Sequence, residues 1–251
     1  MFLKKAILLP IALLPVYLLS CTTTSYQAQS VQYKDYRINS DNLPDSSLLM
    51  LIKPYGDSVN KSMNAVIAES EAELTKQQPE GTLNNLLADA MLVMAKENYK
   101  VPVDASFMNY GGIRLPALPA GNITRGKIFE LSPFDNVLLL LKVKGDVLQS
   151  FLDHTARKGG WPCAGISYQV SNGKAVNVRI GGVMLDAGKT YTIATIDYVA
   201  NGGDDCSMLR NIPQVNNGYL LRDAIIAYFM QEAREGKKLS AKLENRVTNA
   251  N

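Results

Sequence analysis

The chain has 251 residues and a formal net charge of +3 at pH 7. Two of its lysines lie in an N-terminal segment that we expect to be removed, which leaves the mature chain at +1. A near-neutral chain offers no electrostatic basis for binding nucleic acid, so we expect no nucleic-acid partner. Roughly 200 residues follow the N-terminal segments, a size that one domain with one hydrophobic core accounts for.

The first 20 residues have the layout of an export signal. Lys4 and Lys5 precede the apolar stretch Ala6–Leu19, which two prolines interrupt, and this pattern is not that of a membrane span. The stretch ends in Leu-Leu-Ser followed by Cys21, which resembles a bacterial lipobox. We therefore expect a lipoprotein signal peptide over residues 1–20, lipidation of Cys21, and anchoring to a membrane of the bacterial cell envelope without spanning it. The alternative is a plain secretory signal with an incidental cysteine.

Residues 21–45 are expected to form a lipidated N-terminus and flexible tether. Residues 22–30 are small and polar and have no period that could bury one face. One short strand is expected around Tyr33–Ile38. The folded domain is expected over residues 46–251.

Hydrophobic periodicity predicts both helices and strands along the domain. In chain order, the expected elements are a helix over Val59–Leu74, a helix over Leu83–Glu97 with its N-cap at Thr82, a buried strand at Ala105–Met108, a polar loop entering a short helix over Asn122–Phe129, a buried strand at Val137–Val143, a helix that Asp146 caps and that runs to Thr155 or Arg157, a hairpin of Ile166–Val170 and Val176–Ile180 about the turn Asn172-Gly173, a strand at Thr190–Ile196, a helix over Tyr219–Glu235, and an edge strand within Leu239–Val247. These elements indicate an α+β fold, a single domain in which helices pack on a mixed β-sheet.

Three segments carry residues suited to a nucleotide. They are Asn109–Arg114 (Asn-Tyr-Gly-Gly-Ile-Arg), Ser132–Asn136 (Ser-Pro-Phe-Asp-Asn) and Asp197–Asp205 (Asp-Tyr-Val-Ala-Asn-Gly-Gly-Asp-Asp). They supply an arginine fork for an anionic group, aromatic faces for a flat ring, and carboxylates that accept hydrogen bonds from sugar hydroxyls. Each alone also has a structural interpretation: a Gly-Gly turn, an arginine paired with a carboxylate, core aromatics or a capping aspartate. Their combination favours a dispersed nucleotide pocket.

In this order the three segments resemble the C-terminal substrate-binding domain of the 5'-nucleotidase family, with similarity from about Leu51 to Val247. The resemblance implies a role for each of six residues. The implied contacts are Arg114 and Asn109 for the substrate phosphate, Phe134 and Tyr198 for stacking on the nucleobase, and Asp204 with Asn136 for the ribose and the polar edge of the base. Stacking tolerates any aromatic ring, so the base preference stays open.

Three positions depart from the family's pattern. Tyr110 stands where the family usually has a small residue, and Asp135 stands where it usually has glycine. Upstream, Lys76 and Gln77 occupy the place where a second phosphate-binding arginine is usual, and a lysine supplies charge but no bidentate fork.

The resemblance also implies a missing half. Full-length members carry an N-terminal metallophosphatase domain whose two metal ions are held by several histidines, aspartates and an asparagine. The single histidine of this chain, His154, cannot anchor such a site, so we expect no catalytic residue, no metal and no other cofactor here. Divalent metals are expected only in a separate metallophosphatase polypeptide that docks as a partner.

These inferences indicate the substrate-recognition half of a surface 5'-nucleotidase, a hydrolase component of nucleotide catabolism that does not turn over substrate alone. One alternative is a free-standing nucleotide- or nucleoside-binding lipoprotein that serves uptake. Another is an inactive module kept for interaction.

Four further residues carry a structural expectation. His154 is expected to be a surface histidine. Trp161 follows a Gly-Gly pair and is expected to cover the core, with a pocket rim or an interface anchor as the alternative. Cys163 and Cys206 remain once Cys21 is set aside, and an exported chain permits one disulfide between them.

Overall fold

The computed structural model describes residues 27, 29–37 and 45–250. The expected signal peptide over residues 1–20 and the lipidation site Cys21 lie outside the described residues. Residues 29–37 contain neither helix nor strand, so the strand expected around Tyr33 is absent from its described part. The chain divides into two compact units, residues 1–49 and 50–251, and the second contains the sheets.

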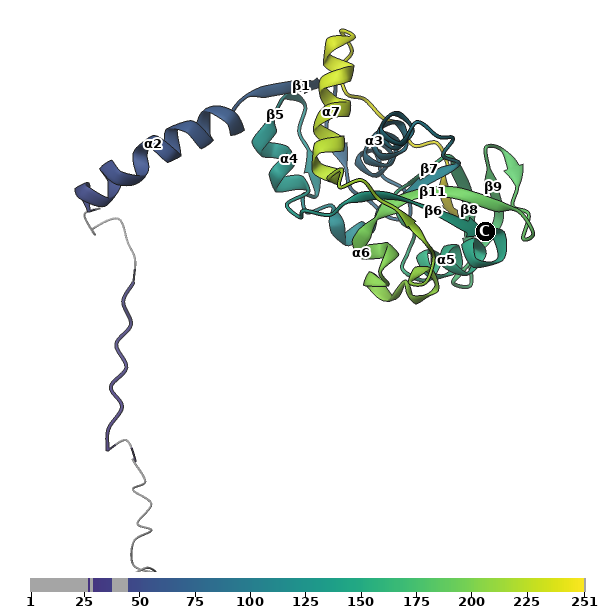
Figure 1. The fold of residues 1–251 in the computed structure, drawn as a ribbon, viewed down its shortest axis with the longest axis horizontal. Helices are drawn as coiled ribbons and strands as arrows, with labels where there is room; N and C mark the ends of the chain where they lie inside the picture. Colours follow the sequence, from purple (N-terminus) through teal and green to yellow (C-terminus); the bar gives the residue numbers. More distant parts are fainter. Residues whose placement is uncertain (1–26, 28, 38–44, 251) are drawn as a thin grey trace, which may run out of the picture. The chain divides into compact units, whose positions relative to one another are not determined.

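A five-stranded mixed sheet forms the centre of the second unit (Figure 1). Its strands, in spatial order, are β12 (Gln214–Val215), β6 (Leu138–Lys144), β11 (Thr190–Ile196), β3 (Ala105–Phe107) and β7 (Cys163–Ala164). Strands β11 and β3 are parallel and the other neighbours are antiparallel. The apolar run of β6 is buried on both faces, which is why it reads as continuous rather than alternating.

Two helices cover opposite faces of this sheet. Successive side chains of a strand point to opposite faces, and in β3 the Ser106 hydroxyl donates to Ala88 O of α3 (Thr82–Tyr99), whereas the ring of Phe107 packs edge-to-face on Phe151 of α5 (Gly145–Arg157). Figure 1 shows α3 and α5 on the two sides of β6 and β11 accordingly. Helix α7 (Leu221–Arg234) lies against α3.

A second sheet of four strands has the order β10, β9, β8, β13. Strands β8 (Ile166–Ser171) and β9 (Lys174–Ile180) form the predicted hairpin, with β10 (Val183–Met184) antiparallel to β9 and β13 (Val247–Asn249) parallel to β8. The remaining elements are the pairs β1 (Val66–Ser70) with β5 (Gly121–Thr124) and β2 (Leu74–Thr75) with β4 (Ala117–Leu118), the helices α2 (Ser46–Met63), α4 (Arg125–Leu131) and α6 (Asp197–Ala200), and the 3-10 turns Tyr110–Gly112, Gly203–Asp205 and Ser207–Leu209. The α+β prediction with a mixed sheet packed by helices is confirmed.

The helix expected over Val59–Leu74 is wrong beyond Met63. Helix α2 ends there, and the chain continues as strand β1, which is antiparallel to β5. Apolar residues such as Val66 and Ile67 satisfy a helical period and a strand pattern equally well over so short a stretch, and their β-branched side chains favour the strand. Across the described part of the chain, no helix is both long and apolar enough to cross a membrane.

Three predicted boundaries also shift. The N-cap of α3 is Gly81, and the Thr82 hydroxyl instead accepts from Thr75 N at 2.9 Å. Helix α5 begins at Gly145, so Asp146 lies in its first turn, where its carboxylate accepts from Val147 N. The edge strand expected within Leu239–Val247 starts only at its last residue and runs on to Asn249.

Candidate functional site

Three loops meet at one edge of the central sheet. The segment Asn109–Arg114 follows the C-terminal end of β3, and Tyr198 follows the end of its parallel neighbour β11. The segment Phe134–Asn136 precedes β6, which is antiparallel to β11 with Leu138 opposite Ile196. The start of β6 and the ends of β3 and β11 therefore lie at the same edge, a place where α/β folds commonly bind ligands.

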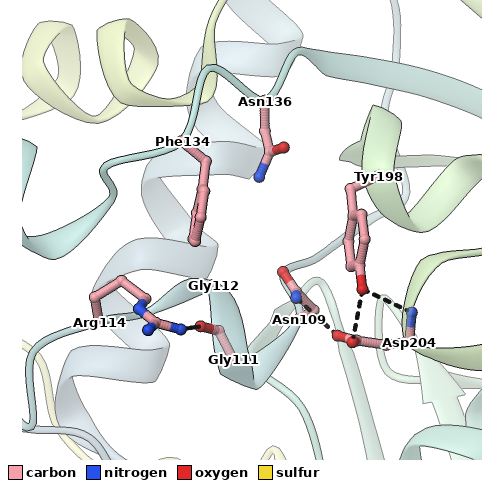
Figure 2. Close-up of a pocket in the computed structure, with 8 residues that line it drawn as sticks. All are labelled: Asn109, Gly111, Gly112, Arg114, Phe134, Asn136, Tyr198 and Asp204. Atoms are coloured by element: carbon pink, nitrogen blue, oxygen red, sulfur yellow. Dashed lines mark hydrogen bonds between the residues drawn. The ribbon is translucent and has the colours of Figure 1, made fainter. Parts of the chain in front are cut away.

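A pocket of about 360 Å³ opens at this edge (Figure 2). It is lined by Gly111 and Gly112 together with all six residues to which the sequence assigned a nucleotide contact: Asn109, Arg114, Phe134, Asn136, Tyr198 and Asp204. Figure 2 shows Phe134 and Tyr198 on opposite sides of an open space. Both residues are nearly half exposed, at 44% and 46%, so neither is a core aromatic and each ring can offer a surface to a flat ligand.

The arginine of the pocket is uncommitted. Arg114 is exposed, its Nη1 donates to Gly111 O at 3.4 Å, and its guanidinium carbon lies 5.7 Å from the centroid of the Phe134 ring. It forms no ion pair with any carboxylate of the described residues. Arg114 is therefore not paired with a carboxylate of the domain, which was the structural alternative for this residue. Its planar guanidinium is open to a ligand anion.

Asp204 is fixed at the other end of the pocket. Its Oδ1 accepts from the Tyr198 hydroxyl at 3.0 Å and its Oδ2 accepts from Asn109 Nδ2 at 2.8 Å. The Tyr198 hydroxyl in turn accepts from Asp204 N at 3.2 Å. Each carboxylate oxygen keeps a further lone pair, so the aspartate can still accept from a pair of ligand hydroxyls.

Asn109, to which the sequence assigned a phosphate contact together with Arg114, bonds to Asp204 in this network. Its amide nitrogen is committed to Asp204, whereas its Oδ1 is buried and has no hydrogen-bond partner. A Cβ on Gly112 would lie 2.6 Å from that oxygen, so any larger residue at this position would force the Asn109 amide to shift. The lone acceptor is of the kind that a ligand N–H or O–H satisfies.

His154 is not on the surface, so that prediction is wrong. The residue is 6% exposed in α5, and its ring packs edge-to-face on Trp161. Its Nε2 lies 2.8 Å from Asp204 O, and since a carbonyl only accepts, Nε2–H is the donor. Through His154, helix α5 thereby supports the backbone of Asp204, a role that no local pattern around His154 signals. Trp161 is 3% exposed and covers the core as expected.

Lys76 and Tyr110, two of the positions that depart from the family pattern, contact each other beside Arg114. The Lys76 ammonium lies 4.0 Å from the centroid of the Tyr110 ring and donates to Ile113 O at 2.8 Å. Desolvation, followed by the positive charge of Arg114, lowers the pKa of Lys76. Two cations thus share one region, and the ring of Tyr110 holds the second of them.

The third departure, Asp135, points to a different partner. Its Oδ1 lies 2.6 Å from Arg222 Nη2 at the start of α7, and its side chain does not line the pocket. The carboxylate that stands where the family usually has glycine is therefore paired with a cation.

The similarity to known proteins agrees with this geometry. The family model described as "5'-nucleotidase, C-terminal domain" matches residues 59–211, more than half of the chain. The chain belongs to the 5'-nucleotidase C-terminal domain family. The matched range contains all three loops of the pocket.

Relatives and solved structures place this 5'-nucleotidase C-terminal domain within longer proteins. The chain is 31% identical over 194 residues to a 5'-nucleotidase of Vibrio vulnificus and 30% identical over 194 residues to Protein UshA of Yersinia enterocolitica, with 73% of this chain and 34% of each relative covered. A 5'-nucleotidase precursor from Thermus thermophilus is similar in structure, with a TM-score of 0.69 and 27% identity over 83% of this chain and 44% of that one. The NAD nucleotidase of Haemophilus influenzae shares the fold, with a TM-score of 0.62 at 18% identity, covering 82% of this chain and 42% of that one. The chain thus spans about a third of the length of the curated relatives it matches.

Within this 5'-nucleotidase C-terminal domain, the part of the chain that the structure describes contains no group of three or more His, Cys, Asp or Glu side chains that could hold a metal ion. Cys163 and Cys206, considered as a disulfide from the sequence, are both free and buried in the structure. Burial raises the pKa of each thiol to about 12, which keeps both protonated and unreactive near neutral pH.

Proposed function

We propose that this domain is the nucleotide-recognising half of a surface 5'-nucleotidase. The observation that carries the proposal is that six residues from three separated loops, each suited to one part of a nucleotide, line one pocket. Phe134 and Tyr198 grip the base, Asp204 accepts from the ribose hydroxyls, and Arg114 holds the phosphate.

The geometry supports a division of the pocket into two ends. Arg114 makes one end cationic, with the Lys76 ammonium close enough for the two charges to interact. The network of Asp204, Asn109 and Tyr198 makes the other end a hydrogen-bonding wall. A nucleoside monophosphate offers a partner for each: an anionic phosphate, and a hydroxylated sugar that links the phosphate to the base. Asn136 has no side-chain hydrogen bond to another described residue and faces the pocket, so its amide is free for the polar edge of the base.

Chemistry belongs to a separate chain in this proposal. A metallophosphatase polypeptide supplies the divalent metals and the activated water, and this domain contributes the orientation of the phosphate toward it. Orientation alone is worth a large part of the barrier in phosphoryl transfer. The 5'-nucleotidase relatives are about three times as long as the region they share with this chain, which leaves room in them for the half proposed to be separate here. An exported, lipid-anchored chain would place the pair at the cell envelope.

The proposal is tested by calorimetric titration of the purified chain with AMP and with adenosine. We expect AMP to bind at least tenfold more tightly than adenosine, a difference of about 1.4 kcal/mol that the phosphate contributes. Arg114→Ala should remove that difference and leave adenosine binding unchanged. Arg234→Ala, an exposed arginine at the end of α7, is the matched control and should alter neither ligand.

The outcomes separate the candidate functions. Equal affinity for both ligands would favour a nucleoside-binding lipoprotein for uptake, and binding of neither, even with a metallophosphatase chain added, would favour an inactive interaction module. Release of phosphate from AMP only when that chain and a divalent metal are both present is the expected result. Metal-dependent turnover by this chain alone would refute the division of labour.

A further inference from the structure

Phe134, which forms one aromatic wall of the pocket, lies in a loop that is part of no helix or strand. Helix α4 ends at Leu131 and strand β6 begins at Leu138, so residues 133–136 belong to neither. The ring of Phe134 is 44% exposed, which means that core packing does not hold it. Its position therefore depends on what fixes the backbone of the loop.

One side chain supplies the hydrogen bonds of that backbone. Arg222 Nη1 donates to Pro133 O at 3.2 Å and to Phe134 O at 3.3 Å, and Arg222 Nη2 donates to Asp135 Oδ1 at 2.6 Å. Among the described residues, these are the hydrogen bonds that positions 133–135 make. A single guanidinium thus binds three successive residues, with the stacking residue in the middle.

Arg222 is itself held rigidly. It is 8% exposed at the start of α7, and its guanidinium carbon lies 4.2 Å from the centroid of the Phe129 ring. The preceding residue, Leu221, donates its N–H to Asn136 O at 2.8 Å, which ties the next position of the same loop to the same helix. A planar fork with donors in fixed directions suits this task, and a lysine ammonium does not reproduce it.

The arrangement serves geometry more than stability. The Asp135 side chain is 78% exposed, so its ion pair is largely screened by water. Arg222 Nε is buried without a partner, which offsets part of what the other bonds contribute. A wall that is ordered before the ligand arrives avoids the entropic cost of ordering it on binding.

We propose that Arg222, paired with Asp135, is a positioning residue that fixes Phe134 as one wall of the pocket, so that affinity for a flat aromatic ring depends on a side chain that does not line the pocket. The inference rests on the proposed function for its ligand, a nucleoside or nucleotide. We call the hydrogen bonds from Arg222 to residues 133–135 the Arg222 clamp. Asp135, which stands where the family usually has glycine, supplies the side-chain acceptor of this clamp.

A double-mutant cycle tests the coupling, with adenosine as the ligand and calorimetry of the full chain as the measurement. We expect Arg222→Met to weaken adenosine binding by about threefold or more, and by no more than Phe134→Ala does, since stacking on one aromatic is worth about 1–3 kcal/mol per base. In the Phe134→Ala background, Arg222→Met should change the affinity by less than about twofold, because a positioning residue acts only through the residue it positions. Equal losses in both backgrounds, or no loss in the first, would overturn the proposal.

Two variants guard against misreading a folding defect. Asp135→Asn removes the charge of an exposed acceptor, so the domain should remain folded, and it should weaken adenosine binding in the same direction by a smaller factor. Arg234→Met removes an arginine from the other end of the same helix and should have no effect. If Asp135→Asn binds like the unaltered chain while Arg222→Met lowers the melting temperature, Arg222 is structural and the clamp is refuted.

Hydrogen exchange gives a readout that needs no ligand. In Arg222→Met, the amides of Val137 and Leu138 at the end of the loop should exchange faster, whereas amides of β11 should keep their protection. If the unaltered chain binds neither AMP nor adenosine, the proposed function fails, yet this measurement still decides the clamp. Unchanged exchange in the loop would overturn it.

Discussion

Gly203 lies against the face of Tyr198, and replacing it by alanine should displace one wall of the pocket. A Cβ at this position would lie 2.5 to 2.6 Å from three atoms of the Tyr198 ring, Cζ, Cε1 and Cε2. Carbon atoms in contact prefer about 3.5–4.0 Å. The ring must therefore move by about 1 Å, and since Tyr198 is 46% exposed it can swing toward solvent. The backbone of Gly203 has no positive φ, so alanine itself is tolerated there.

The loss should appear in binding and not in stability. Displacing the ring removes one stacking face, worth about 1–3 kcal/mol, and separates the Tyr198 hydroxyl from Asp204. These energies correspond to a loss of about 5- to 150-fold in affinity. Calorimetric titration of Gly203→Ala with adenosine measures the loss, and thermal unfolding checks that the fold is retained.

The matched control is Gly56→Ala in helix α2. A Cβ there meets no atom within 4 Å, and alanine in a helix is expected to be neutral or slightly stabilising. Adenosine affinity should not change. If Gly203→Ala binds adenosine within twofold of the unaltered chain, Tyr198 does not stack on the base and the reasoning is refuted.

Three further predictions concern titration, thiol chemistry and packing. Burial, followed by the charge of Arg114, lowers the pKa of Lys76 from 10.5, so this lysine loses its charge at a lower pH than an unperturbed lysine does. As the pH rises, calorimetry should therefore show that AMP affinity falls while adenosine affinity stays constant. Lys76→Met should show no such fall in AMP affinity. Cys163 and Cys206, with pKa values of about 12, should resist iodoacetamide at pH 8 until the protein is unfolded; rapid labelling of the folded chain, or a mass that reports a disulfide, would contradict this. Phe151→Ala should lower the free energy of unfolding by about 3–5 kcal/mol in a urea titration, because the ring is fully buried between Phe107 and Trp161; a loss below about 1 kcal/mol would contradict it.

Elements with a long apolar run or a distinct turn were predictable from the sequence. The strand expected over Val137–Val143 is β6 within one residue at each end, and the strand at Thr190–Ile196 is β11. The hairpin about Asn172-Gly173 formed because both residues adopt positive φ, as the turn requires. The stretch Val66–Leu74 failed because its few apolar residues fit either period, and pairing with β5, distant in sequence, decided for a strand.

The pocket itself was predictable in its lining and not in its supports. The segments that carry Arg114, Phe134 and Tyr198 can be recognised by their composition, and each directly precedes or follows a predicted strand. His154 and Arg222 do not, because each acts on a residue at least 50 positions away in the sequence. An isolated histidine or a helix-start arginine has no local signature of such a contact.

Asp204 and Asp205 both hold the left-handed backbone conformation, with φ of 50° and 66°. Residues with a Cβ pay for this geometry, by about 1 kcal/mol or more each, and glycine does not. Glycine at position 204 would remove this backbone cost, and would also remove the hydrogen bonds of the carboxylate to Tyr198 and Asn109 and the acceptor proposed for the ribose. At position 204, the backbone conformation favours glycine, whereas the proposed recognition of the sugar needs the aspartate side chain.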